Sequence, residues 1–503
     1  MPTGTESLRR LLDVDPRAVS FLYFVAGSMF TLSFAPLSCY GLAPVLVLPL
    51  LTACLWSAPR RAARYAFCFG AGLFLFGTYW LYTSIHIFGQ ASLWIAILLM
   101  IGLALIMAAW YAVLGWLIAA LASGRPWRLV AVAPAAWVAV EWFRGWFLTG
   151  FPWLSLGYGQ VDSPLAGWLP VVGVYGVSFL AVFSAAALIP VATMDSRSRK
   201  IGIALVLLPW LSGAGLQQVD WIHAAGPARA ATIVQGGISQ DRKWLPEQRP
   251  LTLELYRQSL GAHPGSELIV WPEVALPYTI DQVEPYLEQL QDELAAAGRT
   301  LLLGILERDG EAVYNSLLML GSEQRQVYRK RHLVPFGEFF PVPDFIREWM
   351  RLMSLPHSDM TPGDPEQALF TMPDGTKLTA VICYEDAYGA EQLFAFPDAG
   401  LIINVSNDAW FGDSIAPHQH LQIARVRASE VGRFVVRATN NGVSAFIGPR
   451  GEILQTAPQF RYATLTMDVL PMGGNTPYAV AGNWPVITIA FLLLGWFARH
   501  RSL

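Results

Sequence analysis

The chain has 503 residues, of which 54% are hydrophobic and only 14% are charged, and its formal net charge is −3. Soluble domains usually carry about a quarter charged residues, so this composition excludes a wholly water-soluble protein. With no net basic charge, we expect no nucleic-acid partner. Long apolar runs occupy the first part of the chain, and mixed composition follows. We therefore predict an N-terminal transmembrane bundle at 1–216, a water-soluble domain at 217–475 and a C-terminal transmembrane helix at 476–503.

Eight apolar segments approach the length needed to cross a hydrocarbon core of roughly 30 Å. Seven of them precede the soluble domain and one follows it. They are approximately 18–35, 41–57, 65–84, 93–122, 128–147, 168–193, 201–216 and 480–498.

The basic residues that flank these segments predict the orientation of the chain, because Lys and Arg favour the cytoplasmic side of short loops. The loops 36–40, 85–92 and 148–167 contain no Lys or Arg. The alternate connections and both ends of the chain carry all of the flanking basic residues: Arg9, Arg10, Arg17, Arg60, Arg61, Arg64, Arg125, Arg128, Arg197, Arg199, Lys200, Arg499 and Arg501. This alternation predicts a multi-pass protein with both termini in the cytoplasm and the soluble domain outside.

Two charged residues interrupt the fifth apolar segment. Glu141 and Arg144 lie three residues apart, and would therefore share one face of a helix. Charge inside a membrane is costly and often functional. We expect the two side chains to pair and to fix the outer end of the bundle; contact with a phospholipid head group is the alternative.

The soluble region alternates short apolar runs with helical patterns, which is typical of an α/β domain with helices packed on sheet faces. The runs at 229–235, 267–271, 300–306, 315–320, 378–382, 401–405 and 433–439 predict buried strands. The segments 246–261, 281–297 and 417–431 predict helices.

Three chemically capable residues follow such strands. Glu273 comes after "ELIVWP", Lys330 after "QRQVYR" and Cys383 after "LTAVI". Ligand chemistry in α/β folds collects at the carboxyl ends of strands. We therefore expect these three side chains to converge, although each one alone could be a solvated turn residue, a surface cation or an inert core thiol.

Together the three residues provide the parts of nucleophilic acyl transfer. A thiol attacks only as the thiolate, so it needs a neighbouring base or cation. Glu273 is a candidate for the base, and Lys330 for the cation that stabilises first the thiolate and then the oxyanion. The backbone N–H of Tyr384 is a natural second oxyanion donor. Glu338 provides a second carboxylate that would orient Lys330 and keep it protonated.

The cysteines give no sign of a metal site or a disulfide framework. Cys39, Cys54 and Cys68 lie in or beside apolar segments, where a cysteine is usually a small hydrophobe. Neither a CxxC spacing nor a Cys/His cluster indicates a metal, and the sequence predicts no cofactor. Cys383 is thus left as an unpaired thiol in the soluble domain.

These motifs carry a resemblance to a known family. The segments "WPE", "YRKRHLVPFGEFFP" and "CYED" resemble the Glu, Lys and Cys motifs of the nitrilase superfamily. Together with the apolar bundle, the final apolar segment and the stretches "EWFRGWFLTGFPW" and "NVSNDAWFGDS", they resemble the apolipoprotein N-acyltransferase family over nearly the whole chain.

The resemblance implies a multispan helical bundle joined to an αββα nitrilase-like sandwich, placed on the periplasmic side of a bacterial inner membrane. It implies a ping-pong reaction in which Cys383 takes an acyl chain from a phospholipid, typically phosphatidylethanolamine. The chain then passes to the diacylglyceryl-cysteine of an apolipoprotein. By motif, Glu273 is the general base, Lys330 the oxyanion stabiliser and Cys383 the nucleophile. The matching supporting or substrate-binding residues are Glu338, Tyr384, Glu385 and Trp244.

Two other functions remain compatible with the residues. One is a membrane-tethered amidase that hydrolyses a small amide with the same trio, although a single helix would suffice to anchor it. The other is a transporter or sensor without catalysis. The stretch Phe345–Met353, apolar with spaced arginines, is either an interfacial lid or an ordinary amphipathic helix. The site needs no second copy of the chain, so we expect a monomer.

Overall fold

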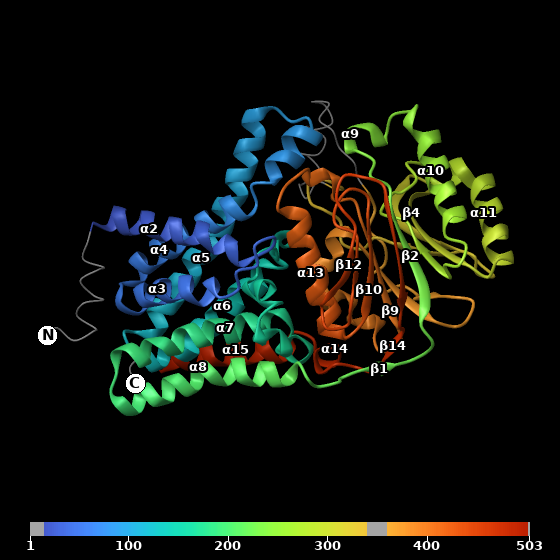
Figure 1. Ribbon diagram of the computed structural model, residues 1–503. Coiled ribbons are helices and arrows are strands. Elements are labelled where there is room, and N and C mark those ends of the chain that lie inside the picture. The colour runs from blue at the N-terminus through green and yellow to red at the C-terminus, as the bar shows by residue number, and fades with distance from the viewer. Residues whose placement is uncertain (1–14, 340–359, 501–503) are drawn as a thin grey trace. The chain divides into compact units, whose positions relative to one another are not determined.

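The computed structural model describes residues 15–339 and 360–500, so the segment Phe345–Met353 lies outside the described residues. The chain divides into two compact units, coloured along the sequence in Figure 1. The first unit comprises 1–220, 413–422 and 480–503, and the second comprises 221–412 and 423–479. Each unit is described by itself below.

Helices make up the first unit, and one of them lies at each of the eight predicted apolar segments. They are α2 (Pro16–Phe30), α3 (Leu42–Trp56), α4 (Pro59–Gly77), α5 (Leu93–Ala122), α6 (Pro126–Arg144), α7 (Leu169–Thr193), α8 (Ser196–Leu216) and α15 (Trp484–Arg499). Three apolar stretches, Leu93–Ala122, Pro164–Thr193 and Ser196–Leu216, are long and apolar enough to cross a membrane. Two shorter apolar helices are α3 and α15.

Small residues allow close packing within this unit. A Cβ on Gly27 of α2 would lie 1.9 Å from the Phe69 carbonyl oxygen of α4, and one on Gly115 of α5 would lie 2.6 Å from that of Ala62. Such approaches are typical of helices that pack in a membrane, where small residues let backbones meet. Large apolar side chains such as Leu98 point outward and are exposed, which suits a lipid environment better than water.

Glu141 and Arg144 are both buried, but they fix a loop rather than forming an ion pair with each other within the described residues. Glu141 Oε1 accepts hydrogen bonds from the Trp137 indole at 2.9 Å and from the Leu156 N–H at 2.8 Å. The Arg144 guanidinium donates to the Trp153 carbonyl oxygen at 2.9 Å. The expected pairing is therefore corrected: because the loop after α6 offers N–H and C=O groups to the two charges, each binds that loop.

Two six-stranded sheets form the second unit. The first sheet has the order β13-β2-β3-β4-β5-β6 and the second has the order β12-β11-β10-β9-β8-β7. The first sheet contains β2 (Arg229–Gln235), β3 (Leu268–Val270), β4 (Thr300–Asp309), β5 (Ala312–Leu320), β6 (Gln326–Arg329) and β13 (Ala463–Val469). The second contains β7 (Phe370–Thr371), β8 (Lys377–Ile382), β9 (Leu401–Ser406), β10 (Phe434–Thr439), β11 (Ala445–Ile447) and β12 (Ile453–Thr456). A small pair, β1 (His223–Ala224) with β14 (Met472–Gly473), completes the strands of this unit that the structure describes.

The two sheets pack face to face. Leu268 and Val270 of β3 join a core that also contains Ile382 and Ile403 of the second sheet. Alternate residues such as Ile269 face the other way. They pack against α10 (Gln248–Ala262) and α11 (Glu284–Ala296), which contribute core residues on that side.

Helix α13 (Ala416–Val431), which belongs to this unit from residue 423 onward, lies on the opposite side of the sandwich from α10 and α11 (Figure 1). Its residues Ala424 and Arg427 lie with Val381 of β8 and Ile402 of β9 around one small pocket, so α13 covers the outer face of the second sheet. This order of layers is helix, sheet, sheet, helix. It confirms the predicted αββα class and explains the long apolar runs, because strands covered on both faces are apolar throughout.

The central strands β2, β3 and β4 are parallel, as are β8, β9 and β10. Parallel strands end at the same edge of a sheet. Residues that follow β3, β8 and β9 are therefore carried to sheet edges where side chains from different strands can meet.

Candidate active site

Glu273 lies three residues beyond the end of β3, in a tight turn, and its side chain is buried. The next residue, Val274, has φ +44°, a left-handed conformation that is unusual for a β-branched side chain and costs about 1–3 kcal/mol. Gly304 on the neighbouring strand makes room for this turn, because a Cβ there would lie 2.4 Å from the Pro272 carbonyl oxygen. The fold therefore holds Glu273 in a strained but specific position.

Lys330 follows β6, is 1% exposed and lies between two carboxylates. Its Nζ is 2.8 Å from Glu338 Oε1 and 3.4 Å from Glu273 Oε1. Burial alone would lower the pKa of Lys330, but the charges of Glu338 and Glu273 outweigh it and raise that pKa well above its ordinary value. The ammonium therefore stays protonated at neutral pH and neutralises part of the acidic pair.

Asn315, on β5, is a member of this cluster that the sequence interpretation missed. Its Nδ2 donates to Glu273 Oε1 at 2.7 Å and to Glu338 Oε1 at 3.0 Å. Lys330, just beyond β6, and Asn315, on β5, thus bridge the same two carboxylates. The signal for Asn315 was a polar residue inside the apolar strand "AVYNSLLML".

Cys383 follows β8 directly and begins the short 3-10 turn η7 (Cys383–Ala387). Its φ is +52°, so the nucleophile candidate, like Val274, sits at a sharp backbone turn. The thiol hydrogen-bonds to the side chain of Ser406. Burial raises the pKa of Cys383 well above its ordinary value; the charge of Glu273 raises it further, and Lys330 opposes the shift. The resting thiol is therefore neutral, so a base is needed at the moment of attack.

Glu385 joins the loop that carries Lys330 to the loop that carries Cys383. Its buried carboxylate accepts from the Ile382 N–H at 2.7 Å, from the Arg331 N–H at 2.6 Å and from the Tyr328 hydroxyl at 3.1 Å. Burial raises the pKa of Glu385, while Arg331 and the two backbone donors act against that rise. Through these bonds, one side chain fixes the spacing between the two loops.

A second buried network lies behind Cys383 and is centred on Arg437 of β10. Its guanidinium lies 3.2 Å from Asp386 Oδ2 and 3.1 Å from Asp408 Oδ2, and it also contacts Asn404. Asp408 in turn accepts from Ser406 Oγ at 2.7 Å. This chain of contacts holds Ser406, the hydrogen-bond partner of Cys383, and it too was missed by the sequence interpretation.

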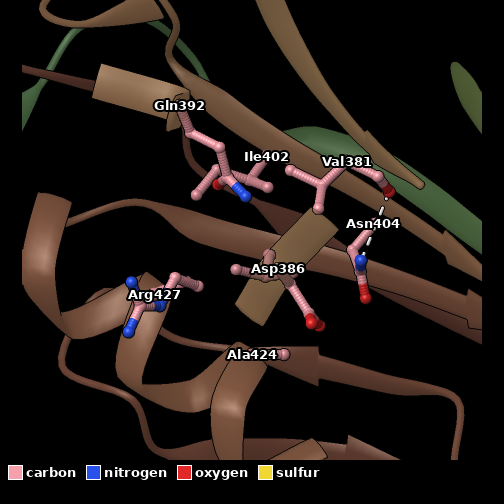
Figure 2. A pocket seen from close by; sticks show the side chains of 8 residues that line it. Val381, Asp386, Gln392, Ile402, Asn404, Ala424 and Arg427 are labelled. Carbon is pink, nitrogen blue, oxygen red and sulfur yellow. Dashed lines mark hydrogen bonds between the residues drawn. The ribbon is translucent and has the colours of Figure 1, made fainter. Parts of the chain in front are cut away.

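Figure 2 shows the edge of this network on the side of α13. A small pocket lies there, lined by Asp386, Gln392, Asn404 and Arg427 among apolar side chains. Asn404 Nδ2 donates to the Val381 carbonyl oxygen at 3.3 Å, which ties the network to the strand that delivers Cys383.

The predicted supporting residues differ in how closely they approach the trio. Glu338 contacts Lys330 directly, and Tyr384 and Glu385 lie in η7 with the thiol. The Tyr384 hydroxyl accepts from the Tyr388 hydroxyl at 3.1 Å. Trp244 follows the short helix α9 (Gln240–Lys243), and its side chain is 41% exposed.

The structure thus carries a buried carboxylate, Glu273, a buried ammonium, Lys330, and the thiol of Cys383 just beyond strands of an αββα sandwich. The carbon-nitrogen hydrolase family model matches residues 230–473, and the model of the apolipoprotein N-acyltransferase N-terminal domain matches residues 26–187. The chain belongs to the apolipoprotein N-acyltransferase family, which confirms the resemblance noted in the sequence.

Two curated relatives carry that assignment. An apolipoprotein N-acyltransferase from Methylococcus capsulatus is 38% identical over 485 residues, covering 95% of this chain and 96% of that protein. One from Azotobacter vinelandii is 40% identical over 492 residues, covering 96% of this chain and 95% of that protein. Among solved structures, a CN-hydrolase superfamily protein from Xanthomonas campestris is 18% identical with a TM-score of 0.36, and the match covers 52% of this chain and 97% of that one.

Proposed function

We propose that this protein transfers an acyl chain from a phospholipid to the α-amino group of a diacylglyceryl-cysteine at the N-terminus of an apolipoprotein. The observation that carries the proposal is the cluster of Glu273, Lys330 and Glu338 at the nucleophile Cys383, in a chain whose other unit is built of apolar helices. A cysteine-based acyl transfer site explains the cluster around Cys383, and a lipid donor explains the apolar helices.

In the first half-reaction Glu273 takes the thiol proton as the sulfur attacks the sn-1 ester carbonyl of the phospholipid. Lys330 and the backbone N–H of Tyr384 stabilise the oxyanion that forms, a kind of contribution worth several kcal/mol in acyl transfer. Collapse of this intermediate breaks the C–O bond, Glu273 returns the proton to the departing oxygen, and a lysophospholipid leaves. The acyl chain remains as a thioester on Cys383.

In the second half-reaction the α-amino group of the diacylglyceryl-cysteine attacks the thioester carbonyl. Glu273 accepts a proton from the amine, and the same donors stabilise the second oxyanion. The C–S bond breaks, the proton is returned to sulfur, and an amide-linked third chain is formed. No net proton is consumed, and the enzyme is restored.

The remaining residues act around this chemistry. Glu338 holds Lys330 in place and keeps it charged, and Glu385 fixes the spacing between the Lys330 and Cys383 loops. Trp244 provides an exposed aromatic surface for substrate. Phosphatidylethanolamine is the proposed donor and the working unit is a monomer.

The proposed topology follows the arginine pattern of the sequence. Residues 1–216 and 476–503 lie in the inner membrane with both termini in the cytoplasm, and the catalytic domain, 217–475, lies in the periplasm. Both substrates keep their chains in lipid, so the periplasmic domain works at the membrane surface.

Labelling of single cysteines tests this topology. In a background without the four native cysteines, we expect Glu311→Cys to react with a membrane-impermeant maleimide in intact spheroplasts. Arg61→Cys should react only after permeabilisation. Both positions are exposed, so accessibility alone does not separate them. Equal labelling in intact spheroplasts would reject the proposed orientation.

The function itself is tested with phosphatidylethanolamine labelled in its acyl chain. Purified protein in detergent should form a hydroxylamine-sensitive acyl adduct, and Cys383→Ala should abolish it. Cys39→Ala is the matched control, because it removes an exposed thiol outside the site and should leave the adduct unchanged. An adduct that persists in Cys383→Ala would remove that residue from the nucleophile role.

Addition of a diacylated lipopeptide separates a transferase from a hydrolase. Mass spectrometry should show that the lipopeptide gains one amide-linked acyl chain. Release of free fatty acid without any gain on the peptide would support the membrane-tethered amidase instead. Absence of any adduct with the wild-type protein would reject acyl transfer from this donor.

A further inference from the structure

We propose that Lys243 is a positioning residue that clamps the backbone of Glu273. It thereby ties residues 238–244, the Trp244 segment, to Glu273. Lys243 is the last residue of α9, and its side chain is only 2% exposed. Its Nζ donates to the Glu273 carbonyl oxygen at 3.2 Å. The adjacent Trp244 points outward, so one residue of this pair reaches the base and the next reaches the surface.

The turn at Glu273 is one that needs such a clamp. Val274 has φ +44°, and the turn packs so tightly on Gly304 that a Cβ there would lie 2.4 Å from both the Pro272 carbonyl oxygen and the Val274 nitrogen. A strained turn persists only where its surroundings hold it. A charge-assisted hydrogen bond from a buried ammonium to the Glu273 carbonyl is a strong contact of that kind.

The other contacts of the Trp244 segment give it fixed anchors. Asn440, just beyond β10, donates to the Ile238 carbonyl oxygen at 2.7 Å, and Asn407, just beyond β9, donates to Gln240 Oε1 at 2.9 Å. The Trp244 segment is therefore anchored through Ile238, Gln240 and Lys243 to residues just beyond the ends of β10, β9 and β3. The last of these anchors is Lys243, and it holds the turn of the base itself.

The charge of Lys243 makes the clamp sensitive to pH. Burial lowers the pKa of Lys243 to about 8, although the charge of Glu273 opposes this change. Among the described residues, Glu273 is the charged group whose field changes the pKa of Lys243. Below pH 8 the ammonium is charged and the clamp is strong. As pH rises through 8, the amine becomes neutral and the hydrogen bond to the Glu273 carbonyl weakens.

The first test follows thioester formation on Cys383 from labelled phosphatidylethanolamine in single-turnover mode, and in this form it rests on the proposed function. We expect Lys243→Met to slow the step about 10–100-fold at pH 7 and to remove the alkaline decline near pH 8. Lys243→Arg should restore the rate to within about fivefold and move the alkaline decline to higher pH. Arg242→Met, which removes an exposed cation from the same short helix, should stay within twofold of wild type.

A wild-type rate for Lys243→Met would overturn the proposal, as would an alkaline decline that Lys243→Arg leaves at pH 8. Unfolding temperatures are measured for all variants. If Lys243→Met fails to fold, the proposal is decided by Lys243→Arg alone. The deciding result is whether the alkaline decline in its rate of thioester formation moves to higher pH.

A second test needs no lipid, so its failure is distinct from failure of the proposed function. Alkylation of Cys383 is measured in a background without the other three cysteines. Because Glu273 raises the pKa of the thiol, a misplaced Glu273 gives faster alkylation, whereas simple loss of a nearby cation gives slower alkylation. We expect Lys243→Met to speed alkylation at least threefold, and to have no effect when Glu273→Gln is already present.

Slower alkylation, or equal effects of Lys243→Met in both backgrounds, would mean that Lys243 does not act through Glu273. The wild-type protein could form no thioester while Lys243→Met still speeds alkylation only when Glu273 is present. The proposed lipid donor would then be wrong, and the positioning role of Lys243 would stand.

Discussion

Replacing Glu273 with glutamine is expected to slow acyl transfer to Cys383 by about 10²–10⁴-fold, the usual contribution of a positioned general base, while making the same thiol react faster with a small alkylating agent. The two effects have opposite signs because Glu273 does two things. Its carboxylate raises the pKa of Cys383, and it is the proposed acceptor of the thiol proton during attack.

The sign follows from the charge that is removed. Wild-type Cys383 has a pKa raised well above its ordinary value, so at neutral pH almost all of it is thiol. Glutamine removes a negative charge next to the sulfur, so the pKa falls and the thiolate fraction at a given pH rises, roughly tenfold for each unit of pKa. Alkylation needs only the thiolate, and the gain in thiolate fraction outweighs the smaller loss of nucleophilicity that accompanies a lower pKa. Acyl transfer also needs a group to return the proton to the leaving oxygen, which glutamine does not provide.

Alkylation by iodoacetamide between pH 6 and 10, in a background without Cys39, Cys54 and Cys68, measures the first effect. Single-turnover transfer from labelled phosphatidylethanolamine measures the second. Lys330→Met is the control of opposite sign: Lys330 lowers the pKa of the thiol, so its loss should slow alkylation. If Glu273→Gln slowed both reactions, the carboxylate would be needed for the structure of the site and the base role would lose its support.

The sequence predicted the central strands well because their physics is local. The run at 229–235 matches β2 in full, and the runs at 378–382 and 401–405 match β8 and β9 to within a residue. These strands lie between two layers, so they are apolar on both faces and stand out against polar connections. The peripheral strand β12 was missed because all four of its residues are exposed, which leaves no apolar run to detect. β13 was missed for a similar reason, since its residues are mostly half-exposed and polar ones recur along it.

The convergence of Glu273 and Lys330 was also predictable, because both follow strands and strand ends gather at one edge; the structure brings their charged groups to within 3.4 Å. Asn315, Arg437 and Lys243 were not found. Asn315 and Arg437 lie inside strands, and Lys243 lies on a helix of four residues. Their partners are 42, 51 and 30 residues away in the chain, so no local pattern shows which polar group each one meets. A polar residue inside an apolar strand is the one usable signal, since a buried polar group needs a partner.

Replacing Glu385 with glutamine is expected to disconnect the Lys330 loop from the Cys383 loop and so to slow acyl transfer by about 10²-fold, a loss typical when catalytic groups move by about 1 Å. The Glu385 carboxylate only accepts hydrogen bonds, and its donors include the N–H groups of Ile382 and Arg331 and the hydroxyl of Tyr328. A glutamine amide would turn an NH₂ group toward at least one of these donors. A buried donor would then lack its acceptor, which costs about 1–3 kcal/mol of folding free energy.

The position of Glu385 makes the catalytic effect larger than this loss of stability implies. Ile382 precedes Cys383 and Arg331 follows Lys330, so the two backbone hydrogen bonds set the separation between the sulfur and the ammonium. Single-turnover transfer and thermal unfolding should be measured on Glu385→Gln beside Glu391→Gln, whose more exposed carboxylate lies 3.2 Å from the His332 ring. The control should transfer at nearly the wild-type rate.

Alkylation of Cys383 gives a second measurement of the Lys330 position, because the charge of Lys330 lowers the pKa of Cys383. Glu385→Gln should therefore slow alkylation of Cys383 as Lys330→Met does. Slow transfer with unchanged alkylation would place the defect in substrate binding rather than in the spacing of the two loops.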